Sequence, residues 1–123
     1  METINASISG TDVTDILKAN VPDLKIEKLI EYNLTKVIDG FAGYTIDLIK
    51  TGNLSAIKDC FNTAEQMLTE GSSEVKNAIE NVYVFSISIF FDIAHAVSKQ
   101  VKELLPVHLM EEYRKQISCS CRP

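Results

Sequence analysis

The sequence predicts an all-α fold, a compact bundle of about five helices with a central buried helix and HEAT-like antiparallel helix hairpins. Apolar residues recur at spacings of three and four along most of the chain. The stretch between Ser72 and Leu105 contains no Gly or Pro. A single strand-like run, at residues 82–89, has no second run to pair with, which disfavours a sheet.

The composition limits the class of protein. A chain of 123 residues with 46% hydrophobic and 24% charged residues is typical of one soluble globular domain. The longest uncharged run has eleven residues, whereas a membrane span needs about 20. The N-terminus lacks signal-peptide features, so we expect a cytoplasmic location. A net charge of −5 argues against nucleic acid as a partner.

The first half of the chain contains two helical regions. Residues 1–10 are polar, and we expect a flexible N-terminus there. Thr11 is an expected N-cap for a helix over residues 12–20, which Pro22 ends. Helical spacing resumes over residues 24–50, with a bend or break expected near residues 32–33 or at Gly40.

A helix over residues 54–70 has the clearest pattern in the chain. Gly52 is expected to end the preceding helix and Asn53 to cap this one. Gly71 is expected to stop it, and Ser72 or Ser73 to cap the next helix. The two helices should therefore form an antiparallel hairpin with a short loop.

The next helix is expected to run over residues 73–104, with a bend near Asp92. Its apolar segment between Glu80 and Asp92 carries three of the five Phe residues, so we expect it to be buried on nearly all sides. Its later part is amphipathic, with an inward stripe of Ile93, Ala94, Val97 and Val101. Pro106 is expected to start the last helix, which ends before Cys119. The inward residues expected in that helix are Val107, Met110, Tyr113 and Ile117. Residues 11–118 then form the domain and residues 119–123 a tail.

The residues that could carry chemistry are few. Cys119 and Cys121 lack the spacing of a zinc site, and Cys60 lies on a helix stripe, so no metal site is predicted. Asp92 with His95 shares a helical face, and His108 with Glu111 and Glu112 forms a similar set, which we interpret as solvated charges at helix ends. No phosphate-binding loop and no nucleophile with a His base occurs, so we expect neither an enzyme nor a cofactor.

Charge is unevenly distributed along the chain. Residues 59–92 contain six acids and Lys76 alone, a balance of 1 − 6 = −5 that equals the net charge of the protein. Such an acidic hairpin suits a basic protein partner, although it also suits a solubilising surface. The candidate partner-binding residues are Asp59, Glu65, Glu70, Glu74 and Glu80. Glu80 adjoins the apolar segment, where partial burial would require a partner such as Lys76.

Several short motifs suggest a relationship. The segment Asn77-Ala-Ile-Glu-Asn-Val, the run Leu104-Leu-Pro106 and the pair Glu112-Tyr113 resemble small helical bacterial proteins of unknown function, some of which are immunity-type proteins that neutralise toxins. The resemblance covers residues 12–117. It implies a non-catalytic cytosolic protein that binds another protein, with Glu80 as a shared polar position. A small-ligand or metal-binding bundle and a structural homodimer remain alternatives.

Overall fold

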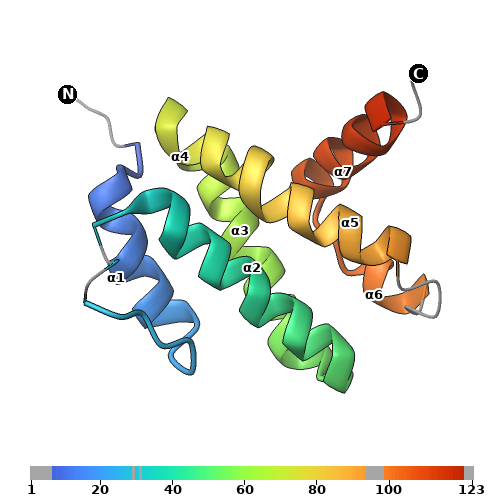
Figure 1. The fold of residues 1–123 in the computed structure, drawn as a ribbon, viewed down its shortest axis with the longest axis horizontal. Helices are drawn as coiled ribbons and strands as arrows, with labels where there is room; N and C mark the ends of the chain where they lie inside the picture. Colours follow the sequence, from blue (N-terminus) through green and yellow to red (C-terminus); the bar gives the residue numbers. More distant parts are fainter. Residues whose placement is uncertain (1–6, 29, 31, 94–98, 121–123) are drawn as a thin grey trace.

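The computed structural model describes residues 7–28, 30, 32–93 and 99–120, and the described chain is helical (Figure 1). The predicted all-α class is confirmed. The first helices are α1 (Gly10–Asn20), α2 (Leu34–Thr51) and α3 (Leu54–Glu70). They are followed by α4 (Ser73–Ala78), the π-helical segment η1 (Ile79–Val84) and α5 (Phe85–Ile93), which form one uninterrupted helix. The chain ends with α6 (Lys99–Glu103) and α7 (Val107–Ser120).

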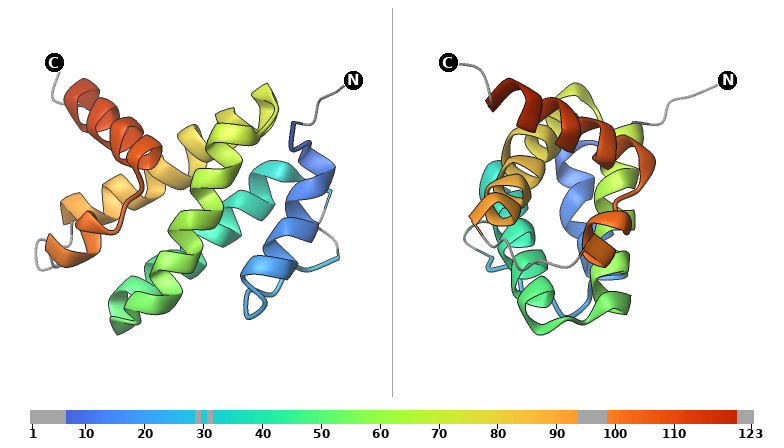
Figure 2. Two further views of the ribbon diagram at one scale, coloured as in Figure 1. Left: turned by 180° about the vertical axis from the view of Figure 1, so that it is seen from behind. Right: turned by 90° about the vertical axis from the view of Figure 1, so that its right-hand side faces the viewer.

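The helices pack in two layers. α2 and the continuous helix α4–η1–α5 run side by side in one layer (Figure 1), and α1 and α3 form the layer behind them (Figure 2). α7 packs against α3, η1 and α5. Among the described helices, α1, α2, α3 and α7 border the continuous helix, and none of them covers its outer face.

The core is centred where η1 packs against α2. Phe41 and Tyr83 stack with ring centroids 4.6 Å apart, and both side chains are buried. The Thr45 hydroxyl donates to the carbonyl of Phe41 at 2.9 Å and lies 2.9 Å from the Tyr83 hydroxyl. Both buried hydroxyls thus have partners, as burial of polar groups requires.

Local signals placed the hairpin of α3 and α4 correctly. Gly52 ends α2 in the left-handed conformation with φ of 76°. The Asn53 side chain accepts the N–H of Ala56 and caps α3. Gly71 follows α3, and the Ser72 hydroxyl accepts the N–H of Val75 at the start of α4. These predictions are confirmed. They could be made from sequence because each depends on chemistry within four residues.

The N-terminal region differs from the prediction in two ways. The N-cap of α1 is Ser9, not Thr11, and the Asp12 carboxylate accepts the Ser9 backbone N–H at 3.0 Å. Ile8 is buried, and its backbone pairs with Glu70 and Ser72 in an isolated bridge. Residues 7–10 are therefore fixed to the α3–α4 loop instead of forming a flexible end. Residues 1–6 lie outside the described part.

The second helical region is shorter than predicted. The described residues between α1 and α2 (21–28, 30, 32 and 33) form turns and loop, and α2 begins at Leu34. The Asn33 side chain caps it by accepting the N–H of Lys36 at 3.1 Å. The break expected near residues 32–33 is therefore present, and Gly40 lies within the helix. A side-chain acceptor at Asn33 favours a helix start there over continuation from residue 24.

The C-terminal third departs most from the prediction. Ile93 was expected inward but is 72% exposed, and Ala94 and Val97 lie outside the described residues. In α7, Val107 was expected inward and is 61% exposed, whereas Leu109 is buried. The helix also continues through residue 120 instead of ending before Cys119. The phase of α7 is set by its contacts with α3 and η1, which are distant in sequence.

Candidate functional site

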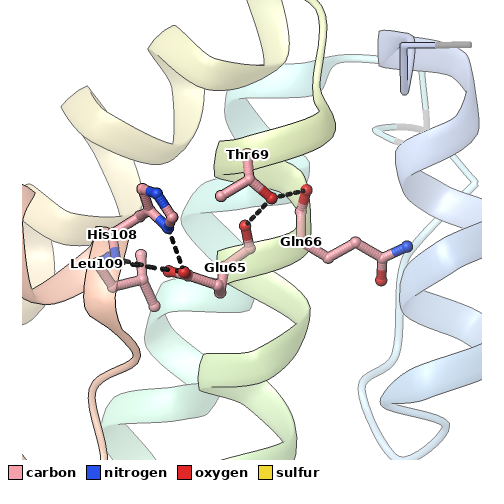
Figure 3. A network of polar contacts seen from close by, with 5 residues as sticks. All are labelled: Glu65, Gln66, Thr69, His108 and Leu109. Carbon is pink, nitrogen blue, oxygen red and sulfur yellow. Dashed lines mark hydrogen bonds and ion pairs between the residues drawn. The ribbon is translucent and has the colours of Figure 1, made fainter.

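Glu65 turns toward α7, not toward solvent. Figure 3 shows its carboxylate directed at the start of α7, while the next side chain, Gln66, points to the other side of α3. The carboxylate accepts the backbone N–H groups of His108 at 3.2 Å and Leu109 at 2.9 Å, and lies 2.7 Å from Nδ1 of His108. A carboxylate at this position satisfies N–H groups that have no partner within the helix and complements the helix dipole.

Three of the other predicted acidic residues, Asp59, Glu70 and Glu74, are exposed. Asp59 is exposed and shares a polar groove with the end of α1, where Asn20 and Gln66 also lie. Glu70 is exposed at the end of α3. Glu74 is exposed on α4, beside Gly10. The partner-binding role predicted for these exposed acids therefore stays a prediction.

Glu80 lies in η1 and is half-buried. The Nε2 of Gln116 on α7 donates to the Glu80 backbone carbonyl at 2.7 Å and to the Glu112 carboxylate at 2.8 Å. Among the described residues, no ion pair joins Glu80 to Lys76, the partner considered from sequence. The position therefore links η1 to α7 through its backbone.

A polar groove lies where the start of α2 meets α4 and η1. Its polar lining consists of Tyr32, Asn33, Thr35, Glu74, Asn77 and Asn81. Tyr32 is 87% exposed, and among the described lining residues Glu74 alone carries a charge. We call this feature the amide groove because asparagine amides dominate it.

An exposed stripe extends from the amide groove along the outer face of the continuous helix. Its members, which we call the outer stripe, recur every four residues and are Asn77, Asn81, Phe85, Ile89 and Ile93. Phe85 is 52% and Ile89 43% exposed. The expectation that this apolar segment is buried on nearly all sides is therefore wrong, because none of the described helices covers its outer side. Clustered exposed apolar side chains often mark an interaction site.

The π-helical segment reduces the drift of this stripe around the helix axis. In a regular α-helix, positions four apart drift around the axis because one turn takes about 3.6 residues. The wider turn of η1 opposes that drift, since π-helical hydrogen bonds join residues five apart. The buried face shows the same spacing of four in Val75, Ile79, Tyr83, Ile87 and Phe91. That strict period was the sequence signal for a widened turn, and our sequence reading missed it.

The residues considered for metal or acid–base chemistry do not converge in the described structure. His108 contacts Glu65 instead of forming a site with Glu111 and Glu112, and Asp92 is exposed. Within the described residues, no three His, Cys, Asp or Glu side chains gather where they could hold a metal ion. His95, Cys121 and the side chain of Cys119 lie outside the part described.

Cys60 lies in the core beside Thr45, and burial raises the pKa of its thiol to about 11. A thiol with so high a pKa is a poor nucleophile near neutral pH. Its role in the described structure is packing.

These features define an all-α protein whose outer surface combines an amide-rich groove with an apolar stripe. Residues 14–119 match the family described as a domain of unknown function (DUF7674), and the chain belongs to that family. No curated protein and no solved structure is significantly similar to it. Among the helices described here, none has the length and hydropathy needed to cross a membrane.

Proposed function

We propose that this protein is a non-catalytic cytoplasmic module that binds another protein through the outer face of α4, η1 and α5. The observation that carries this proposal is the exposure of Phe85, Ile89 and Ile93 along one helix face. Large apolar side chains in a continuous row expose surface that a protein partner would remove from water. The resemblance to immunity-type proteins, which act by binding a toxin, fits this proposal.

The charge of the partner follows from the groove beside the stripe. Glu74 lines the amide groove. Glu70 is exposed at the end of α3, just before the loop that leads into α4. A basic partner would gain association rate and specificity from this charge. Glu65 contributes little to it, because its carboxylate is bound to the start of α7.

The test is affinity capture from the native host with wild type and two variants. Phe85→Ser combined with Ile89→Ser removes the apolar surface, and Val107→Ser removes a similarly exposed apolar side chain from α7 as the matched control. We expect one stoichiometric protein with wild type and the control, and its loss with the double variant. Equal capture by all three proteins would refute the proposed surface.

Charge is tested on the captured partner by calorimetry. Glu74→Lys should weaken binding, and more so at low salt, because the charge borders the proposed surface. Asp59→Lys is the matched control, since Asp59 lies in the groove between α1 and α3. Equal effects of the two substitutions would indicate a nonspecific response to net charge.

A further inference from the structure

We propose that the outer stripe binds an extended peptide segment of the partner, about eight residues long, with apolar side chains at alternate positions and a cationic residue at each end. This inference rests on the proposed function and deepens it. It is drawn from the spacing, chemistry and charge of the stripe.

The spacing of the stripe matches an extended chain. Residues four apart on a helix are about 6 Å apart along its axis. Side chains on one side of an extended peptide recur every two residues, or about 6.7 Å. Every second side chain of such a peptide can therefore meet one stripe residue. From Glu74 to Asp92 the helix rises about 27 Å, which about eight extended residues span.

The asparagines suit the main chain of such a peptide. Asn77 and Asn81 are exposed neighbours on one helix face, and both line the amide groove. Each side-chain amide offers one acceptor and two donor hydrogens, so it can pair with the N–H and C=O of a peptide unit. An extended segment has these groups free, whereas a helical segment has already used them internally. The asparagines thus favour an extended occupant.

The rest of the stripe suits apolar side chains. Phe85, Ile89 and Ile93 follow the asparagines at the same spacing. Full burial of an aliphatic or aromatic side chain stabilises by roughly 1.5–3 kcal/mol. Alternate apolar residues of the peptide would face this row, while the intervening residues would face solvent.

The ends of the stripe suit cations. Glu74 lines the amide groove, where none of the described lining residues is cationic. Asp92 is exposed next to Ile93 at the opposite end. Each end also has one lysine nearby, since Lys50 lies 5.9 Å from the Phe90 ring centroid and the exposed Lys76 directly precedes Asn77. A lysine at each end of the peptide would face a carboxylate whichever way the chain runs.

The test uses fluorescein-labelled synthetic peptides of about eight residues and fluorescence anisotropy. The first peptide has lysines at both ends and valine alternating with serine between them. The second has the same composition, with its valines placed at helical spacing. The third replaces both lysines of the first with glutamates. We expect saturable binding of the first peptide and at least roughly tenfold weaker binding of the other two.

Protein variants locate the contact. Asn77→Ala combined with Asn81→Ala, and separately Phe85→Ser, should each weaken binding of the first peptide roughly tenfold. Asn62→Ala and Val107→Ser alter an exposed amide and an exposed apolar side chain elsewhere, and should leave binding unchanged. Circular dichroism establishes that each variant is folded. Equal binding by stripe and control variants would overturn the inference.

The outcomes separate this inference from the proposed function. Tighter binding of the helical-spacing peptide, or no binding of the first peptide, would overturn the extended occupant while protein capture through Phe85 could still stand. Sedimentation of the protein alone tests whether a second copy of the chain occupies the outer stripe. A dimer that Phe85→Ser dissociates would overturn both the peptide and the partner proposal.

Discussion

The carboxylate of Glu65 on α3 lies 2.7 Å from Nδ1 of His108, which is 43 positions later at the start of α7. It also accepts the backbone N–H groups of His108 and Leu109. One side chain thereby caps a helix that belongs to another part of the chain. The contact joins the α3–α4 hairpin to the C-terminal helix.

Glu65→Gln should destabilise the fold by about 1–3 kcal/mol, because it removes charged hydrogen bonds and places an amide donor against N–H donors. His108→Ala should cost less, since the two backbone contacts remain. Urea denaturation measures both changes. Glu70→Gln is the control, since its exposed carboxylate should contribute within about 0.5 kcal/mol. If Glu65→Gln destabilises the protein no more than Glu70→Gln does, the capping role of Glu65 is contradicted.

Removing the Thr45 hydroxyl should lower the free energy of unfolding more than removing the Tyr83 hydroxyl. The Thr45 hydroxyl donates to the Phe41 carbonyl, so it can accept from Tyr83. Tyr83→Phe leaves that donor paired and should cost about 0.5–1.5 kcal/mol. Thr45→Val leaves the Tyr83 hydroxyl without this partner and should cost about 1–3 kcal/mol. Thermal or urea unfolding of both single variants and the double variant gives the coupling energy, which should be nonzero.

Replacing glycine by alanine should stabilise the protein at one position and destabilise it at two others. Gly43→Ala should stabilise by about 0.5–1 kcal/mol, because Gly43 is helical and a Cβ there meets no atom within 4 Å. Gly52→Ala should destabilise by about 1–2 kcal/mol, because φ is 76°. Gly71→Ala should destabilise more, since its Cβ would clash with the Met67 carbonyl oxygen. Midpoints of urea unfolding rank the three, and any other order would contradict this explanation.

The parts of the fold that were predictable depend on local chemistry. Asn53 and Ser72 cap helices through side-chain acceptors that reach three residues ahead, and Gly52 supplies a left-handed φ. Such signals can be read from a short window of sequence. They located α3 and its hairpin without knowledge of the rest of the chain.

The parts that were missed depend on contacts between distant segments. Glu65 reads as a surface acid in sequence, and only the position of α7 turns it into a cap. The exposure of Phe85 follows from the absence of a described helix over the outer face, which its apolar sequence context did not indicate. The π-helical turn was detectable in principle, because a strict spacing of four from Val75 to Phe91 exceeds the α-helical period.

The stability of the protein should fall at alkaline pH through Cys60. Burial raises the pKa of its thiol from 9.0 to about 11, so between these values the unfolded thiol ionises while the folded thiol stays protonated. The unfolded state then binds fewer protons, and the free energy of unfolding decreases as pH rises, by at most about 1.4 kcal/mol per pH unit. The contribution is fully present below pH 9.

The measurement compares urea unfolding from pH 8 to 11 for two proteins, both with Cys119→Ser and Cys121→Ser so that Cys60 is the remaining thiol. The protein that keeps Cys60 should lose stability more steeply above pH 9 than its Cys60→Ala counterpart, whatever their difference at pH 8. Burial is the largest cause that raises the pKa of Tyr83 well above 10, and the charge of Cys60 is a smaller one, so Tyr83 adds a similar slope to both proteins. Parallel pH profiles would mean that the Cys60 thiol ionises equally in the folded and unfolded states.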